Sequence, residues 1–264
     1  MKIATWNVNS IRIRQQQVSH WLQMNPVDVL CLQETKVIDA DFPKMPFEEL
    51  GYHLYISGQP SYNGVALLSR QPLEDVRIGF TQVLGVDDVL AATFDQQKRV
   101  ISGIFHDVRI VNLYVPNGAD LSSDKYAYKL QWLKMLRNYL TLFKENYPQE
   151  LCVCGDFNVA PEDKDIHNPK GKETHIMATP QERKALQEVL EIGLKDAFRK
   201  FTAEGGHYSW WDYRSGGFQR NRGWRIDHHF LTPKLYEQAT SCTIDIEPRK
   251  QEKPSDHTPV IVEF

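Results

Sequence analysis

The sequence predicts an α/β protein in which β-sheets stack together and helices cover them. Strand-like segments recur from end to end and outnumber the helical patterns, and helices occur in both halves without a regular alternation of strand and helix. The chain has 264 residues, of which 41% are hydrophobic. A chain of this length buries one sizeable core without disulfide or metal support. We therefore expect a single domain over residues 1–264.

The predicted strands are rich in β-branched and aromatic residues and are bounded by Gly, Pro, Asn or Asp. They cover residues 2–6, 27–32, 53–57, 64–69, 99–105, 108–115, 151–155, 225–231, 243–247 and 259–264. One long region, residues 160–177, is too polar for core and has no strand character. Loops of this length are usually functional or mobile.

Three helices are predicted from apolar residues that recur at three- or four-residue steps. Ser10 is the expected cap of the first helix, and Ser122 or Ser123 starts a long helix that ends near Asn146. A third helix follows Thr179. The residues expected on the buried face of the first helix are Ile11, Val18, Trp21 and Leu22.

Charge and hydropathy exclude two broad classes of protein. The net charge of −3 argues against a general polyanion binder, although it leaves room for a local basic face. The longest apolar runs are four residues, far short of the roughly 20 needed to span a bilayer. The first residues, MKIATWNVNS, lack the apolar stretch of a secretory signal. We therefore expect no membrane partner and a cytoplasmic location.

The four cysteines, Cys31, Cys152, Cys154 and Cys242, contain no CxxC pair. Three of them lie inside apolar strand-like runs, where a reduced thiol packs as a small hydrophobic group. Their spacing therefore argues against zinc binding and redox chemistry.

Polar side chains follow several predicted strands at the point where each apolar run ends. Ligand sites of sheet proteins gather at strand ends, so we expect these side chains to converge. Taken singly, each is more typical of a turn or cap residue. Together they form a set of oxygen ligands that suits Mg²⁺ or Mn²⁺, and metal-assisted attack of water on a phosphodiester is the chemistry that this set supports. The set contains Asn7, Glu34, Tyr114, Asn117, Asp156, Asn158, Asp227, Asp256 and His257.

A serine hydrolase also combines Asp with His, but that class needs a positioned serine nucleophile. The sequence has no GxSxG motif, and Ser255 follows Pro254, which makes a poor nucleophile turn. We therefore reject this class.

The motifs TWNVNSIR, LQETK, GVALLSR, YVPNG, GDFNVAP, DIHNPK, YSWWDYR, NRGWRIDH and KPSDHTPV run along nearly the whole chain. In this order the sequence resembles the exodeoxyribonuclease III family, the bacterial apurinic/apyrimidinic endonucleases of the endonuclease/exonuclease/phosphatase superfamily. The resemblance implies a four-layer αββα sandwich of DNase I-like fold, in which two mixed sheets lie face to face and helices cover them.

The resemblance also implies a role for each matching residue. Glu34 is the expected principal Mg²⁺ ligand, Asp156 orients or deprotonates the attacking water, and Asp227 orients a protonated His257. The residues expected to take part in catalysis are Tyr114, Asp156, Asn158, Asp227 and His257. Those expected near the metal are Asn7, Glu34, Asp156, Asn158, Asp256 and His257. Asn158 is expected on an extended chain, facing the same side as Asp156.

The stretch from Lys195 to Arg225 carries seven Lys and Arg residues against three acidic residues, with aromatic residues interleaved. Cations beside flat apolar surfaces are what a nucleic-acid groove requires, although about half of such aromatics would serve the core. The resemblance places the pocket for the abasic sugar at Trp210, Trp224 and Ile226. Further DNA contacts are expected at Lys36, Tyr62, Asn63, Asn117 and Arg222.

The function implied by the resemblance is DNA repair. We expect an Mg²⁺-dependent nuclease, with Mn²⁺ as a substitute, that cleaves duplex DNA 5′ to abasic sites and leaves a 3′-hydroxyl. Exonuclease and 3′-end-cleaning activity, a monomeric state and association with the nucleoid through DNA are also implied. Asn9, where some relatives carry Asp, leaves the number of metal ions open.

Two alternatives compete with this hypothesis. A phosphoesterase of the same superfamily that acts on a lipid or RNA phosphodiester would share the same acidic residues, but a lipid-directed enzyme needs an exposed apolar loop that the sequence does not show. A nucleic-acid-binding module without activity would have no use for four clustered carboxylates facing a polyanion.

Overall fold

Two six-stranded sheets form the centre of the computed structural model, which describes residues 1–264. The first sheet contains β1 (Lys2–Asn7), β2 (Val29–Gln33), β3 (His53–Ser57), β4 (Val65–Ser69), β11 (Ser241–Ile244) and β12 (Val260–Glu263). The second contains β5 (Glu74–Ile78), β6 (Val100–Phe105), β7 (Val108–Tyr114), β8 (Glu150–Asp156), β9 (Lys195–Asp196) and β10 (Asp227–Leu231). The strand orders are β11-β12-β1-β2-β4-β3 and β5-β6-β7-β8-β10-β9.

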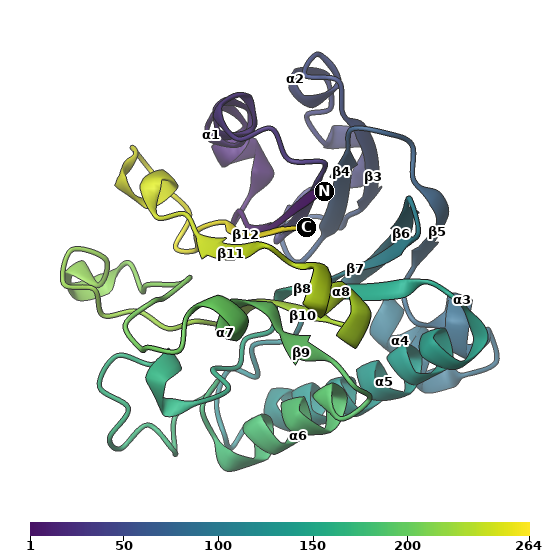
Figure 1. Cartoon of the computed structure of the whole chain (residues 1–264). Helices are drawn as coiled ribbons and strands as arrows, with labels where there is room; N and C mark the ends of the chain where they lie inside the picture. Colours follow the sequence, from purple (N-terminus) through teal and green to yellow (C-terminus); the bar gives the residue numbers. More distant parts are fainter.

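Helices cover the outer faces of both sheets. They are α1 (Ile11–Met24), α2 (Met45–Glu48), α3 (Thr81–Leu84), α4 (Val89–Asp95), α5 (Asp124–Asn146), α6 (Pro180–Leu190), α7 (Ala197–Phe201) and α8 (Pro233–Gln238). Figure 1 shows α1 and α2 on one side of the sheets and α5 and α6 on the opposite side. The α/β class and the four-layer sandwich are thus confirmed. No helix is both long enough and apolar enough to span a bilayer.

Three hydrophobic clusters hold the four layers together. The first joins α1 to the outer face of the first sheet, and the second joins α5 and α6 to the outer face of the second. The third lies between the two sheets and includes Cys31 from one sheet and Cys152 and Cys154 from the other. All four cysteines are free and buried, as predicted.

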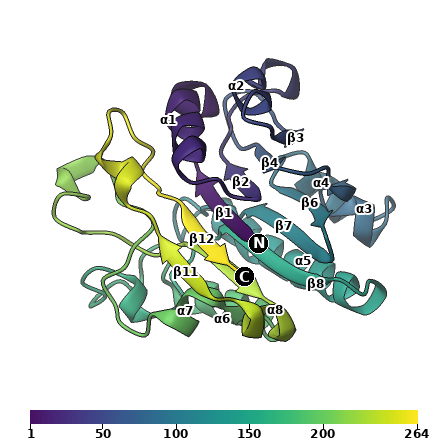
Figure 2. The same cartoon turned by 45° about the horizontal axis from the view of Figure 1, so that its top comes forward.

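Each sheet has a parallel pair at its centre with antiparallel strands on both sides. The pairs are β1 with β2 and β7 with β8. In a parallel pair both carboxyl ends lie at the same edge of the sheet, which is where polar ligand groups collect. Strand β12 pairs with β1, and Figure 2 shows the two chain ends side by side.

The predicted helices form for the expected reasons, with one exception. Helix α1 buries the four predicted residues, and α5 begins after Ser123, whose hydroxyl accepts a hydrogen bond from the backbone N–H of Lys125 at 3.1 Å. Thr179 and Glu182 form a reciprocal capping box at the start of α6. Ser10 precedes α1 but makes no side-chain cap, because its φ of 91° turns the backbone away from the usual cap conformation.

Some elements are not predicted from the sequence. Strand β5 is largely exposed at a sheet edge and β9 has only two residues, so neither shows a clear apolar pattern. The strand expected at residues 243–247 instead ends at Ile244. Helix α4 covers part of an apolar run whose composition does not separate a strand from a buried helix.

Candidate active site

Residues from both sheets meet at the carboxyl ends of the central strands. Asn7 ends β1, Glu34 follows β2, and Asp156 ends β8. The Asn7 amide Nδ2 donates to Glu34 Oε1 and to Asp156 Oδ2, each at 2.9 Å. A single buried amide therefore connects the two sheets at the point where their acidic side chains approach each other.

The backbone reverses sharply around these side chains. Asn9, Glu34, Lys36 and Asn158 all have positive φ, between 45° and 55°. Side chains other than Gly, Asn and Asp are rare in this left-handed region because Cβ crowds the backbone. The chain thus turns at Asn158 and is not extended there as predicted; its amide N–H folds back to Asp156 Oδ1 at 2.9 Å.

His257 lies between two carboxylates. Its Nδ1 is 2.9 Å from Asp227 Oδ2, and its Nε2 is 3.7 Å from Asp156 Oδ2. Ser209 donates its hydroxyl hydrogen to the same Asp227 oxygen at 2.7 Å, whereas Asp227 Oδ1 is buried without a partner. The imidazole ring is thereby fixed, with Nε2 turned toward the acidic cluster.

The electrostatics of this cluster favour a charged imidazole. Burial alone would lower the pKa of His257, but Asp227 and Asp156 outweigh it and raise that pKa to about 10. Burial raises the pKa of Asp156, and Asp227 and Glu34 raise it further while His257 opposes them. For Glu34, Lys36 and Asn7 overcome the effect of burial and lower the pKa.

The donor set fits a hard divalent cation. Ligand atoms of Glu34, Asp156 and His257 lie within 4.8 Å of one another. A protonated His257 has no free lone pair, which leaves the carboxylate oxygens as ligands. Asn7 turns Nδ2 toward them, and its Oδ1 accepts the backbone N–H of Asn9 at 3.0 Å. Carboxylate oxygens suit Mg²⁺ or Mn²⁺. Asp227 Oδ1, which is buried without a hydrogen-bond partner, is a further sign of uncompensated negative charge.

Asp256 lies beside this cluster, and both of its oxygens accept hydrogen bonds. The donors are Asn9 Nδ2 and Trp210 Nε1, each at 3.0 Å. Burial would raise the pKa of Asp256, but His257 and these donors lower it. Asn9 also accepts a hydrogen bond from Lys36 Nζ at 2.6 Å, so it joins Asp256 to the Lys36–Glu34 ion pair. This role of Asn9 was not predicted from the sequence, where Asn9 is only a departure from some relatives.

Ser255 has a structural role here. Its hydroxyl donates to the carbonyl oxygen of Asn7 at 2.7 Å and accepts the backbone N–H of His257 at 3.2 Å. With its proton bound to a carbonyl, Ser255 is not poised as a nucleophile, which agrees with the rejection of the serine-hydrolase class.

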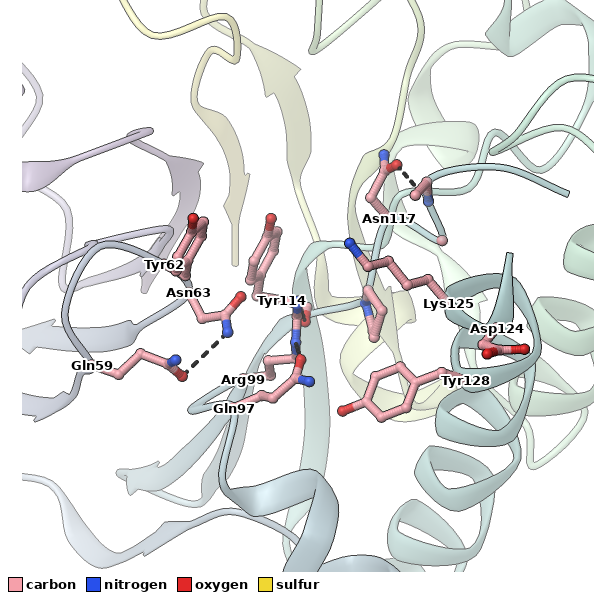
Figure 3. A pocket seen from close by; sticks show the side chains of 13 residues that line it. Gln59, Tyr62, Asn63, Gln97, Arg99, Tyr114, Asn117, Asp124, Lys125 and Tyr128 are labelled. Atoms are coloured by element: carbon pink, nitrogen blue, oxygen red, sulfur yellow. Dashed lines mark hydrogen bonds between the residues drawn. The ribbon is translucent and has the colours of Figure 1, made fainter. Parts of the chain in front are cut away.

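A cavity of about 610 Å³ opens beside Tyr114 (Figure 3). Four residues predicted to contact the substrate line it, namely Tyr62, Asn63, Tyr114 and Asn117. Arg99 and Lys125 add two cations that sequence analysis missed, because neither lies in a motif. The Arg99 guanidinium lies 4.5 Å from the centre of the Tyr114 ring. Burial and the charge of Glu34 raise the Tyr114 pKa well above its usual value, so its phenol stays protonated.

The three residues expected to form the sugar pocket lie together on the other side of the site. Ile226 and Trp224 are buried in a small apolar cluster, and Trp210 is half-buried at its edge. The rings of Trp210 and Trp224 are perpendicular, with centres 6.5 Å apart, and His175 lies 5.1 Å from Trp224. Only Trp210 therefore presents substantial surface next to Asp256.

Most cations of the stretch from Lys195 to Arg225 serve the fold, although their number suggested a locally basic groove. Arg225 and Arg199 pair with buried Asp165, and Lys200 donates to three backbone carbonyls. Lys195 and Arg214 also have acidic partners. Only Arg220 and the exposed Arg222 in this stretch lack an internal hydrogen bond or ion pair from the side chain.

Known proteins share this architecture over its full length. The Endonuclease/Exonuclease/phosphatase family model matches residues 4–257. Exodeoxyribonuclease III of Haemophilus influenzae is 34% identical over 276 residues, covering 100% of both chains. An AP endonuclease structure from Archaeoglobus fulgidus matches with a TM-score of 0.92 and 40% identity, covering 100% of this chain and 99% of the other.

A third similar structure contains nucleic acid. The 3′ phosphatase NExo from Neisseria, bound to a product DNA hairpin, matches with a TM-score of 0.93 and 39% identity, covering 100% of this chain and 99% of the other. Sequence and fold agree over the whole chain. The chain therefore belongs to the endonuclease/exonuclease/phosphatase family.

Proposed function

We propose that the protein is an Mg²⁺-dependent DNA-repair nuclease that cleaves duplex DNA 5′ to abasic sites, trims and cleans blocked 3′ ends, and leaves a 3′-hydroxyl. The observation that carries this proposal is the joining of Glu34 and Asp156 by Asn7, beside a fixed His257. Relatives named as an exodeoxyribonuclease, an AP endonuclease and a 3′ phosphatase support the same substrate class.

Glu34 and Asp156 are the residues that would hold the cation, and Asn7 keeps their two carboxylates together through Nδ2. When bound, the cation polarises the phosphate and neutralises charge that develops in hydrolysis. The raised pKa of Asp156 suits it to accept a proton from the attacking water. Asn158 Nδ2 donates to Asp156 Oδ2 at 3.2 Å and to the carbonyl oxygen of Val115 at 3.0 Å. A contact from this amide to a phosphate oxygen would replace one of these two hydrogen bonds.

His257 and Tyr114 would contact the phosphate from different sides. His257 stays protonated at neutral pH because Asp227 holds Nδ1, so Nε2–H is free to donate to a phosphate oxygen. Tyr114 keeps its phenolic proton and can donate it to the phosphate or to the leaving oxygen. Both groups are held in place before substrate arrives, so little reorganisation is needed during the reaction.

The surroundings of the site favour a polynucleotide over a lipid. Arg99 and Lys125 line the cavity on one side and Trp210 lies on the other, so a strand that crosses Tyr114 meets cations and a flat aromatic surface. Lys36, Tyr62, Asn63, Asn117 and Arg222 are proposed backbone contacts. A monomer that works in the cytoplasm on nucleoid DNA is the state we propose with this activity.

A labelled duplex with one tetrahydrofuran abasic analogue tests the activity directly. We expect incision 5′ to the analogue in Mg²⁺ or Mn²⁺, none in EDTA, and a loss of about 10³-fold or more in Glu34→Gln. A duplex ending in a 3′-phosphate measures end cleaning in parallel. Cleavage of an RNA duplex or a lipid phosphodiester at a higher kcat/KM than either DNA would overturn the choice of substrate.

Trp224→Ala tests the expected sugar pocket. Because Trp224 packs behind Trp210, we expect abasic incision to fall more than binding to intact duplex. Trp21→Ala is the matched control, since Trp21 is as deeply buried as Trp224 but lies on α1 and packs against the first sheet. Equal losses of incision and binding in Trp224→Ala, as in the control, would show that Trp224 is only part of the core.

A further inference from the structure

We propose that the core between the two sheets contains a second metal site, formed by Cys152, Cys154 and His229, which takes Zn²⁺ or a similar thiophilic cation. It differs from the candidate active site in its ligands, which are sulfur and nitrogen, and it lies deeper in the molecule. The proposal does not depend on the nuclease activity.

Strand pairing brings the three side chains together. Cys152 and Cys154 are alternate residues of β8 and point to the same face, and His229 of β10 is directly opposite Cys154. Their ligand atoms all lie within 4.8 Å of one another, and Cys152 Sγ is 3.7 Å from His229 Nδ1. Ligand atoms at Zn–S and Zn–N distances of about 2.3 and 2.0 Å in a tetrahedral site are about 3.5 to 3.8 Å apart, so small rotations close the site.

The histidine ring is oriented as a metal ligand would be. His229 Nε2 lies 2.9 Å from the carbonyl oxygen of Val260, which can only accept a hydrogen bond. The proton of a neutral ring is therefore on Nε2, and the Nδ1 lone pair faces the thiols. Histidines that bind metals usually donate their other ring N–H to a carbonyl or carboxylate in this way.

The charge of the complex suits an apolar core. When Zn²⁺ binds, two Zn–S bonds form, the two thiol protons leave to solvent, and the imidazole remains neutral, so ion and ligands together carry no net charge. A neutral complex avoids most of the cost of burying an isolated ion. Cys31, on the facing sheet, contacts Cys154 from across the core.

The proposed site would brace the strands that carry catalytic residues. Asp227 is paired with Asp156 across β10 and β8, and His229 is paired with Cys154 two positions further along the same ladder. A metal bound there would tie β8 to β10 directly beneath the acidic cluster. The sequence does not predict this site, because a CxC pair and a histidine 75 residues away match no zinc spacing.

Cobalt is the probe for this site, because Co²⁺ bound to thiolates has a strong sulfur-to-metal absorption that oxygen ligands do not produce. The full chain, with Mg²⁺ in excess, is titrated with Co²⁺ in the native state and also refolded in its presence, so that slow entry into the core is not limiting. We expect one equivalent of Co²⁺ with this absorption, displaced by one equivalent of Zn²⁺. At about 100 times Kd, Zn²⁺ should raise Tm by about 5–10 °C.

Variants connect the signal to the three residues. Cys152→Val and His229→Phe should lose the absorption and the rise in Tm, whereas Cys242→Val, which removes another buried thiol of the same core, should keep both. X-ray absorption on the wild-type protein, which needs no variant to fold, should show sulfur and imidazole around the metal. No thiolate absorption after refolding, only oxygen around the bound metal, or a signal that survives in Cys152→Val would each overturn the proposal.

Discussion

The candidate active site and a neighbouring ion-pair cluster come within two residues of each other on the chain, at Asp227 and Arg225, yet their buried charges are balanced differently. The ion-pair cluster consists of Asp165, Asp196, Arg199 and Arg225, and its two carboxylates are matched by two guanidiniums. Arg225 is 2.6 Å from Asp165 and 2.7 Å from Asp196. Nothing in this cluster calls for a further ion.

The active site is not balanced in this way. Four carboxylates, those of Glu34, Asp156, Asp227 and Asp256, share only two nearby cations, Lys36 and protonated His257. One divalent ion would neutralise the remaining charge. The comparison shows that a buried acid alone does not mark a functional site; an acid without a matching cation does.

The largest expected effect is on catalysis. Asp156→Asn removes the proposed base and metal ligand, so we expect kcat/KM for abasic incision to fall about 10³- to 10⁴-fold. Because the substitution also relieves repulsion between like charges, Tm in the absence of Mg²⁺ should stay the same or rise. Thermal unfolding and incision assays on the same preparation check both, and a large fall in Tm would contradict the view that this site is electrostatically unbalanced.

The ion-pair cluster should respond to the loss of a carboxylate in the opposite way, with a fall in stability and no loss of activity. Asp165→Asn leaves two buried guanidiniums with one carboxylate, so we expect the free energy of unfolding to fall by about 3–5 kcal/mol. The Mg²⁺ concentration needed for half-maximal incision should not change below the melting temperature. Urea denaturation and Mg²⁺ titration test these expectations, and a shifted Mg²⁺ requirement would show that the two regions are coupled.

His228 supplies a pH test of the ion-pair cluster. Burial and then the charge of Arg225 lower its pKa from 6.5 to about 4, so the folded state holds it neutral. In the unfolded chain His228 takes up a proton near pH 6.5. Its contribution to the free energy of unfolding is therefore complete above that pH and falls by about 3 kcal/mol as the pH drops to about 4. In His228→Gln this part of the acid-induced loss should disappear. If the stability of His228→Gln fell with decreasing pH as steeply as that of the wild type, His228 would not be the source of this loss.

The smallest expected effect is at the surface. Asp163 pairs with Arg183 at 2.8 Å, but its side chain is 72% exposed. Asp163→Asn should change the free energy of unfolding by less than about 1 kcal/mol. Urea denaturation of this variant is the control for Asp165→Asn. Both substitutions remove a carboxylate of the same 3₁₀ turn (Asp163–Asp165), but Asp163 is exposed and Asp165 is buried.

The central elements are predictable from the sequence because their patterns arise from burial. Strands such as β1 and β8 are buried along nearly their whole length, and α1 and α5 bury regular apolar stripes. Edge strand β5 has no such pattern, since its side chains face solvent. The acidic residues were predicted from their positions at the ends of strands, and the family resemblance supplied the role of each one.

Pairing of charges could not be read from the sequence. Arg225 and Arg222 look equivalent within one basic stretch, but Arg225 is buried against acids from two other segments while Arg222 is exposed. Arg99 and Lys125 were missed because their cavity is assembled from distant segments. Contacts of this kind depend on tertiary packing, which a local pattern does not encode.

The left-handed backbone at Asn9, Glu34, Lys36 and Asn158 has a consequence for protein engineering. Each of these positions would be less strained with glycine, so the present side chains lower stability in return for chemistry. A selection scheme that rewards only the yield of folded protein would therefore accumulate substitutions at these positions. The selected variants would be more stable but inactive. Thermostable variants of this chain should therefore be sought with these four residues unchanged.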